Sequence, residues 1–267
     1  MSRKRPTIAD LRAMKREKKQ LTMLRVLNLE ELEAAERAAI DIVSVPTELI
    51  LDPCFREAAP GIFAMPGENF FEIGTADDFL RWAFKVYKAS ADAVYCSAGF
   101  ATVKRLADDN IPVIGHVGLI PSRATWTGGF KAVGKTAETA MQIFDAVKQY
   151  EAAGAFGAEI EVVPVEVAAA ISARTSLFLL SMGAGTGCDA QYLFAEDVLG
   201  QNRGHMPRHS KVYRNFAAEY DRLQAERVAA FSEFAADVHR KAYPEERHIL
   251  HMDASELRKF MAKVAAA

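Results

Sequence analysis

The chain has 267 residues, of which half are apolar and a quarter charged, and its formal net charge is −2. This balance is ordinary for a globular protein and gives no basic footprint for nucleic acid or an anionic membrane. No apolar run approaches the roughly 18 residues of a membrane span. The polar N-terminus also lacks the apolar core of a signal peptide, so we expect a cytoplasmic protein with no membrane partner.

The chain contains three cysteines, Cys54, Cys96 and Cys188. They are widely spaced and odd in number, which argues against a disulfide framework and against a Cys-x-x-Cys metal site. We expect reduced thiols that are mostly buried.

Short apolar runs alternate with longer segments of helical period, which is the pattern of strands joined by crossover helices. Most of the runs are apolar at consecutive positions, as expected when both faces of a parallel sheet are covered. The expected strands are 21–27, 39–46, 61–67, 91–96, 111–119, 156–163, 177–185 and 190–194. The expected helices between them are 29–38, 76–89, 100–108, 136–153 and 165–173.

Eight strands with intervening helices predict an α/β fold, a (β/α)8 TIM-type barrel. A doubly wound open sheet is the alternative, but no Gly-x-Gly-x-x-Gly or Walker-type loop follows the first strand. After the barrel, a polar loop leads into a long helix over about 213–241. We expect one domain, 1–267, with this C-terminal helical extension starting at about residue 211. Such a helix packs on the outside of the barrel or on a neighbouring subunit.

The segment "GHVGLIPSRATWTGGFKAVGK", 115–135, is the most informative for chemistry. His116 ends a predicted strand, where a histidine can donate to a developing oxyanion or take a proton near neutral pH. The other interpretation is a histidine satisfied by a backbone carbonyl. Lys131 lies in the glycine-rich loop that follows and can bind a substrate carboxylate, although loop lysines are more often simply solvated.

Two carboxylates, Glu159 and Glu161, share one face of the predicted strand 156–163 because side chains alternate along a strand. A carboxyl group at the mouth of a barrel is partly removed from water, which makes it a better base. Glu161 lies nearer the C-terminal end of the strand and is our candidate general base. The turn "SMGAGTG" that begins at Ser181 contains Gly183, whose backbone amide can hold an anionic substrate group.

Several segments together resemble the ketopantoate (3-methyl-2-oxobutanoate) hydroxymethyltransferase family of the phosphoenolpyruvate mutase and isocitrate lyase superfamily. They are "TIADLRAMKREKKQLTML", "IPVIGHVGLIPS", "GGFKAVGK", "EAAGAFGAEIEVVPVEVA", "GAGTGCDAQYLFAEDVLG" and "YPEERHILHMD". The matches follow one order over nearly the whole chain.

The resemblance implies a barrel whose active groups lie at the C-terminal face, and a homo-oligomer. It also implies transfer of a one-carbon unit from methylenetetrahydrofolate to 2-oxoisovalerate through an enolate, a step of pantothenate biosynthesis. A magnesium-type ion would chelate the 2-oxo acid while a glutamate takes the C3 proton. The family's catalytic glutamate falls on Glu161, and its strand-end histidine falls on His116.

The sequence departs from the family at the metal site. The carboxylates expected there fall on Thr47, near Met65 and on Ser97, and the lysine two residues before the last of them falls on Tyr95. No metal ligand therefore remains at a family position, and the replacement candidates are Glu48 and Glu68. We expect Thr47, Tyr95 and Ser97 to contribute instead to substrate binding.

Three hypotheses remain open from the sequence. The first is the family's hydroxymethyltransferase, with its metal bound in a rearranged way. The second is a metal-independent lyase or transferase that makes or breaks a carbon–carbon bond in another small 2-oxo acid. The third is a non-catalytic homologue that binds a ligand or acts as a regulatory subunit.

Overall fold

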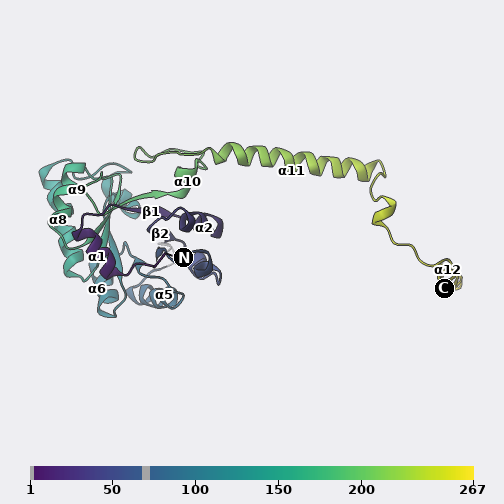
Figure 1. Cartoon of the computed structure of the whole chain (residues 1–267), viewed down its shortest axis with the longest axis horizontal. Helices are drawn as coiled ribbons and strands as arrows, with labels where there is room; N and C mark the ends of the chain where they lie inside the picture. The colour runs from purple at the N-terminus through teal and green to yellow at the C-terminus, as the bar shows by residue number, and fades with distance from the viewer. Residues whose placement is uncertain (1–2, 68–72) are drawn as a thin grey trace. The chain divides into compact units, whose positions relative to one another are not determined.

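The computed structural model describes residues 3–67 and 73–267. The chain divides into two compact units, Met1–Arg214 and Asn215–Ala267. The first unit holds all the strands and the candidate site (Figure 1). The expectation of a single domain stays a prediction.

The strands of the first unit form one eight-stranded parallel sheet with the order β3-β2-β1-β8-β7-β6-β5-β4. An isolated parallel bridge between Gly67 and Tyr95 joins the two outer strands and nearly closes the sheet into a barrel. The strands are β1 (Leu21–Arg25), β2 (Ile42–Val45), β3 (Phe63–Pro66), β4 (Val94–Tyr95), β5 (Val113–Gly118), β6 (Gly157–Glu161), β7 (Phe178–Met182) and β8 (Ala190–Phe194). This arrangement confirms the predicted TIM-type barrel and contradicts the alternative of an open doubly wound sheet.

Helices surround the strands, and each predicted helix between strands is present (Figure 1). Capping boxes fix the starts of α1, α5 and α8, because a threonine hydroxyl accepts from a backbone amide of the first turn. The helices of this unit are α1 (Ile8–Arg16), α2 (Leu29–Arg37), α3 (Thr47–Ile50), α4 (Phe55–Ala58), α5 (Ala76–Lys88), α6 (Phe100–Asp108), α7 (Ala124–Thr127), α8 (Ala137–Ala152), α9 (Val165–Ser172) and α10 (Ala195–Leu199).

Two hydrophobic clusters lie on the two faces of the curved sheet. One packs the outer faces of the strands against the helices. The other fills the barrel interior and comes from alternate positions, such as Leu21 and Met23 on β1 and Phe178 and Leu180 on β7. The interior side chains therefore continue along each strand toward its C-terminal end, where the candidate site lies.

Helix α1 closes the N-terminal end of the barrel. Leu11 is 1% exposed and belongs to the interior cluster together with Phe63 and Phe156. Lys15 donates to Asp189 at 2.8 Å, and the same carboxylate accepts from the backbone N–H of Leu179 at 2.7 Å. Asp189 is therefore a structural residue at the barrel floor, in keeping with a turn or capping role.

The second unit contains the long helix α11 (Phe216–His239), a short 3-10 turn and α12 (Ala254–Ala265). The long helix is two to three residues shorter at each end than the sequence predicted. No residue of α11 is buried, although it carries several large apolar side chains. Within the described part of the chain, no helix is both long and apolar enough to cross a membrane.

Candidate active site at the barrel mouth

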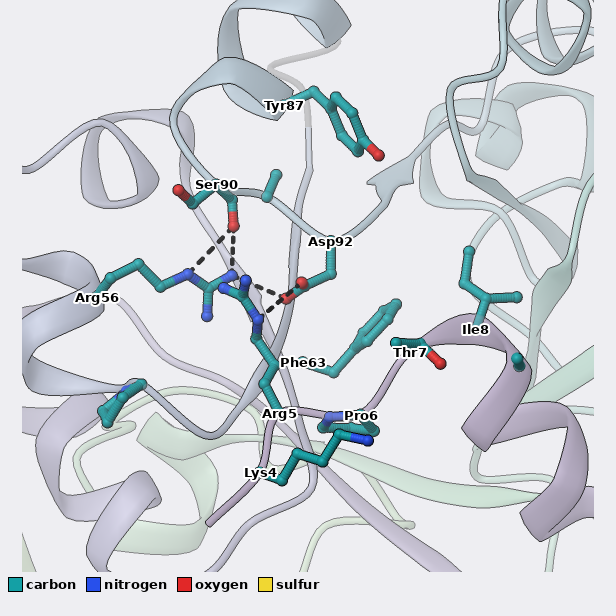
Figure 2. A pocket seen from close by; sticks show the side chains of 13 residues that line it. Lys4, Arg5, Pro6, Thr7, Ile8, Arg56, Phe63, Tyr87, Ser90 and Asp92 are labelled. Carbon is teal, nitrogen blue, oxygen red and sulfur yellow. Dashed lines mark hydrogen bonds and ion pairs between the residues drawn. The ribbon is translucent and has the colours of Figure 1, made fainter. Parts of the chain in front are cut away.

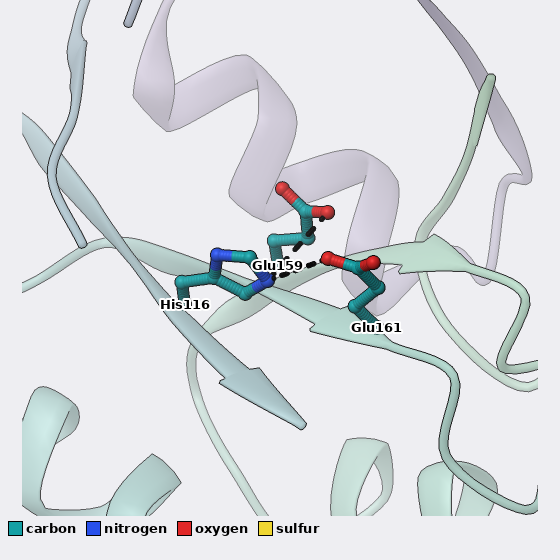
Figure 3. Close-up of side chains that lie close together, drawn as sticks. All are labelled: His116, Glu159 and Glu161. Carbon is teal, nitrogen blue, oxygen red and sulfur yellow. Dashed lines mark hydrogen bonds and ion pairs between the residues drawn. The ribbon is translucent and has the colours of Figure 1, made fainter. Parts of the chain in front are cut away.

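Three ionisable side chains meet inside the barrel where β5 and β6 approach their C-terminal ends. His116 pairs in register with Glu159, and Gly118 pairs with Glu161. Because alternate residues of β6 face the same side, Glu159 and Glu161 both project toward the imidazole. Figure 3 shows the histidine on one strand and the two glutamates on its neighbour.

The contacts within this group are short and shielded from water. His116 Nε2 lies 2.9 Å from Glu161 Oε2 and 3.8 Å from Glu159 Oε1 (Figure 3). The exposed fractions are 4% for His116, 3% for Glu159 and 9% for Glu161. The group is thus a buried acid–base cluster whose most exposed member is the predicted base.

Tyr95 completes the cluster from the end of β4. Its hydroxyl lies 2.5 Å from Nδ1 of His116, and the two rings meet edge to face with centroids 5.7 Å apart. Both ring nitrogens of His116 therefore have hydrogen-bond partners. Glu161 as a carboxylate can only accept, so Nε2 carries a proton, whereas the Tyr95 hydroxyl can either donate to Nδ1 or accept from it.

The surroundings favour the charged form of His116. Burial by itself lowers the pKa of the imidazole, but the charges of Glu159 and Glu161 and the hydrogen bond to Glu161 outweigh it and raise the pKa above 6.5. Burial also raises the pKa of Glu159, and the nearby imidazole offsets only part of this effect. Glu159 therefore binds a proton more tightly than an exposed glutamate, and in its ionised form its charge favours the protonated imidazole of His116.

Backbone geometry brings Glu161 close to its neighbours. Gly118 has φ +90°, and a Cβ built there would lie 2.2 Å from the carbonyl oxygen of Glu161. Only glycine allows this approach of β5 and β6. Val162, directly after Glu161, has φ 51°, which is costly for a β-branched residue and is characteristic of functional sites. Its N–H donates to the carbonyl of Met182 at 2.8 Å, which holds the strained turn in place.

A second group of polar side chains faces the cluster from β1, β2 and β8. Tyr192 is 4% exposed, and burial raises the pKa of its hydroxyl. Ser44 and Arg25 oppose this shift through polar interactions with the hydroxyl. The positive charge of Arg25 also acts on Glu159 by lowering its pKa.

His116, Glu159 and Glu161 each offer a ligand atom within 4.8 Å of one another, so the metal expectation can be tested on them. A magnesium-type ion prefers about six oxygen ligands. Here the imidazole is hydrogen-bonded through both nitrogens, its raised pKa favours the protonated form, and a protonated imidazole cannot ligate. Among the described residues, this donor set therefore does not fit such an ion.

The other predicted metal and substrate positions that the structure describes come from other segments of the barrel. Thr47 begins α3, and its hydroxyl accepts from Trp82 Nε1 at 2.9 Å. Glu48 is exposed on the same short helix, Ser97 is buried after β4, and Gly183 follows β7 with φ +68° beside His209. Glu68 lies outside the described residues. The binding roles assigned to these residues stay predictions.

Lys131 lines a separate cavity of about 520 Å³ between β5 and α8. The cavity has His116 and Gly118 on one side and Lys135, Thr136 and Tyr150 on the other. It adjoins the acid–base cluster only through His116. Lys131 can therefore meet a ligand that extends from the barrel mouth along α8.

A cavity of about 1010 Å³ lies at the opposite end of the barrel, next to the starts of α1 and β3 (Figure 2). Its arginines are already paired, since Asp92 accepts from Arg56 at 2.8 Å and lies 3.3 Å from Arg5. Tyr87 and Ser90 line the same cavity. This cavity is not our candidate active site, because the active groups of such barrels lie at the C-terminal ends of the strands.

The sequence interpretation overlooked Arg25 and Tyr192 and gave Glu159 no role. Period-2 alternation provides a signal for all three. Leu21, Met23 and Arg25 share the interior face of β1, and Tyr192 has the same orientation on β8. A polar residue on an otherwise apolar interior face near a strand's C-terminal end marks the site.

Comparison with known proteins finds sequence relatives of one family. The family model for ketopantoate hydroxymethyltransferase matches residues 62–246. The 3-methyl-2-oxobutanoate hydroxymethyltransferase of Nitrosopumilus maritimus is 33% identical over 193 residues, which cover 71% of this chain and 67% of that protein. The 3-methyl-2-oxobutanoate hydroxymethyltransferase of Dehalococcoides mccartyi strain CBDB1 is 35% identical over 64% of this chain and 60% of its own length. Enzyme 1 of Methylibium petroleiphilum is 28% identical over 97% of this chain and 94% of its own length.

Solved structures share the barrel at low identity. Phosphonopyruvate hydrolase in complex with oxalate and Mg²⁺ aligns with a TM-score of 0.51 and 13% identity, over 98% of both chains. 2,3-Dimethylmalate lyase, a member of the phosphoenolpyruvate mutase and isocitrate lyase superfamily, aligns with a TM-score of 0.49 and 13% identity, over 96% of this chain and 98% of its own. The predicted family resemblance, and with it a transferase of the hydroxymethyltransferase type, is confirmed by the sequence relatives. The chain belongs to the ketopantoate hydroxymethyltransferase family.

Proposed function

We propose that this protein transfers a one-carbon unit to a small 2-oxo acid through an enolate, with 2-oxoisovalerate as acceptor and methylenetetrahydrofolate as donor. The observation that carries the proposal is the buried contact of 2.9 Å between His116 Nε2 and Glu161 Oε2. A carboxylate at a barrel mouth can accept a proton from a substrate carbon, while a protonated imidazole beside it stabilises the negative charge that develops on the substrate oxygen.

Glu161 is the base in this proposal. It takes the C3 proton of the oxo acid, the C–H electron pair forms the C2–C3 double bond, and negative charge develops on the C2 oxygen. C3 then attacks the one-carbon unit, and a new carbon–carbon bond replaces the lost C–H bond. The carbon–nitrogen bonds to the folate break, water supplies the hydroxyl group of the product, and tetrahydrofolate leaves with one proton from C3 and one from water. Two features support this role. Glu161 lies opposite Gly118 in the strand register, and the strained turn at Val162 holds its carboxylate in one place.

His116 is the acid partner of the base. Its raised pKa favours the cationic imidazole, and in this form the ring can compensate the negative charge of the enolate without moving. Tyr95 holds the ring at Nδ1, and Glu159 contributes charge from 3.8 Å beside Nε2. These two residues are positioning residues, since they act through the imidazole.

The test is proton–deuterium exchange at C3 of 2-oxoisovalerate, followed by NMR with Mg²⁺ and with a chelator. We expect exchange in the wild-type protein and a loss of about 10²- to 10⁴-fold in Glu161→Gln. Glu166→Gln is the matched control, because Glu166 is exposed in the first turn of α9 and should leave exchange unchanged. Unaltered exchange in Glu161→Gln would show that the base is assigned wrongly.

A second candidate is the metal-independent lyase or transferase acting on another small 2-oxo acid. It is favoured by the replacement of the family's expected metal carboxylates by Thr47, Met65 and Ser97, with Met65 only 1% exposed among apolar side chains. Exchange that is indifferent to the chelator would support metal-free enolisation. No exchange under either condition would favour a different oxo acid or the non-catalytic binding role.

Further expectations about this protein follow from its family membership. We expect folate as the source of the one-carbon unit, a homo-oligomer as the working form, and a cytoplasmic location. Addition of methylenetetrahydrofolate to a protein that already catalyses exchange should convert 2-oxoisovalerate to its hydroxymethyl product, with one equivalent of tetrahydrofolate released. Exchange without product formation would contradict the choice of donor while preserving the role of Glu161.

A further inference from the structure

Arg25 brings a positive charge to the mouth of the barrel. It is the last residue of β1, and it continues the interior face formed by Leu21 and Met23. In register it stands beside Ser44 of β2 and Phe194 of β8. A long cationic side chain at this position extends from the apolar interior toward the entrance.

The contacts of the guanidinium show where it lies. Its central carbon is 5.7 Å from the centroid of the Phe194 ring, a cation–π distance. A Cβ built on Gly67 would lie 4.0 Å from one of its terminal nitrogens, so the group reaches past β2 to the end of β3. It also interacts with the buried hydroxyl of Tyr192. These contacts place the charge on the rim that the acid–base cluster faces.

Arg25 has no counter-ion within the described part of the chain, since no carboxylate there lies within 4.0 Å of the guanidinium. Other partly buried cations behave differently: Arg56 pairs with Asp92 and Lys15 pairs with Asp189, each at 2.8 Å. A half-buried cation with no carboxylate close to it is costly, and neutral partners such as the Tyr192 hydroxyl offset only part of that cost. The cost is recovered when an anionic ligand binds it.

The chemistry of the proposed substrate matches this cation. A 2-oxo acid carries a carboxylate next to its carbonyl, and a planar guanidinium can hold both carboxylate oxygens at once. The donor set of His116, Glu159 and Glu161 does not fit a magnesium-type ion, and His116 is assigned to the enolate oxygen, so the substrate carboxylate needs a cation of its own. Arg25 is a fixed cation that faces the same interior as Glu159.

We propose that Arg25 binds the carboxylate of the 2-oxo acid and supplies the positive charge that a divalent ion would otherwise bring. This inference rests on the function proposed above, because it takes the substrate class from there. It assigns Arg25 to substrate binding and Glu161 to proton removal.

The test measures binding apart from turnover. Isothermal titration of the full-length protein with 2-oxoisovalerate, in the presence of a chelator, gives the dissociation constant without any metal. We expect Arg25→Met to weaken binding by about 10- to 100-fold and Arg25→Lys to recover only part of that loss. Arg37→Met on the exposed face of α2 is the control and should bind as the wild type does.

An uncharged ketone separates carboxylate binding from a general disturbance of the site. 3-Methylbutan-2-one keeps the carbonyl and the C3 proton of 2-oxoisovalerate but lacks the carboxylate. The second-order rate constant for its C3 exchange should change less than threefold in Arg25→Met. The same constant for 2-oxoisovalerate should fall by about the factor by which binding weakens. Equal losses for both compounds would overturn the assignment.

The outcomes distinguish this inference from the proposed function. Carboxylate binding that depends on Arg25, without C3 exchange in any variant, would uphold the role of Arg25 and contradict the enolising activity. C3 exchange in the wild type together with unchanged binding of 2-oxoisovalerate in Arg25→Met would support the enolising activity and contradict the role of Arg25. Binding of 2-oxoisovalerate by the wild type only when Mg²⁺ is present would overturn the inference.

Discussion

His116 Nε2 and Glu161 Oε2 lie 2.9 Å apart, although the two residues are separated by 45 positions in the chain. The contact arises because parallel strands β5 and β6 are neighbours and place the two side chains on one interior face. Burial strengthens such a pair and also makes its protonation sensitive to nearby charge. The surrounding residues therefore offer several ways to test the site.

The substitution Glu159→Gln should lower the pKa of His116. Glu159 is the largest of the influences that raise this pKa, and the amide keeps the shape while removing the charge. An NMR titration of the imidazole Cε1 proton should show a midpoint above 6.5 in the wild type and a lower one in the variant. The alkaline limb of the C3 exchange profile should move in the same direction. An unmoved midpoint would contradict the electrostatic role of Glu159.

The free energy of unfolding should fall as pH rises from 6 to 8.5. His116 has a raised pKa in the folded state, so the stability it contributes is fully present below its unfolded pKa and is lost as pH passes the folded value. Glu159 also binds its proton more tightly when folded, so rising pH removes stability there too. Urea unfolding at both pH values would measure the decline, and the double substitution His116→Gln with Glu159→Gln should flatten it. A flat wild-type profile would contradict the prediction.

The substitution Gly118→Ala should disturb Glu161 without touching its side chain. The new methyl group would meet the carbonyl oxygen of Glu161 at 2.2 Å, and φ +90° is unfavourable for alanine. We expect a loss of about 1–3 kcal/mol in the free energy of unfolding and at least a tenfold loss of C3 exchange. Gly74→Ala is the control, because nothing lies within 4 Å of a Cβ at that position. Exchange at the wild-type rate in Gly118→Ala would show that the position of Glu161 is not critical.

The helix α11 should mediate self-association of the chain. Tyr220, Leu223, Phe231, Phe234 and Val238 fall on one face of the helix at helical spacing, and all of them are exposed. A second copy that covers this face would bury it. Sedimentation analysis of the double substitution Phe231→Glu with Phe234→Glu should show a smaller species than the wild type. Ala229→Glu, on the opposite face, should leave the mass unchanged; a monomeric wild type would contradict the expected homo-oligomer.

The barrel was predictable because its signals are local. Buried parallel strands are apolar at successive positions, and the helices between them start at residues with strong capping chemistry, such as Thr75 and Thr136. The observed strands are mostly shorter than the apolar runs, since each run continues into the loop that follows the last ladder hydrogen bond. Short helices such as α3 and α10 have too few residues to show a period.

The site was only partly predictable, because its partners come from different strands. Glu161 and His116 stand at recognisable strand ends, and the sequence suggests both of them. The contact of Tyr95 with His116 depends on the register of β4 against β5. The position of Arg25 depends on a sheet that curves round to bring β1 beside β8. Alternation along β1 indicates that Arg25 faces the interior, but no local pattern shows which side chains it meets there.

The closed floor of the barrel has a consequence for the movement of protons. Because Leu11 and the Lys15–Asp189 pair close the N-terminal end, the cluster around His116 is shielded from solvent on that side and opens toward the mouth. A substrate that enters by that opening also shuts it. A proton taken by Glu161 is then held in the site until the ligand leaves, so it can return to the same carbon before a solvent deuteron replaces it. The rate of solvent exchange would therefore be lower than the rate of enolate formation, and a deuterium label placed at C3 would survive several rounds of enolate formation.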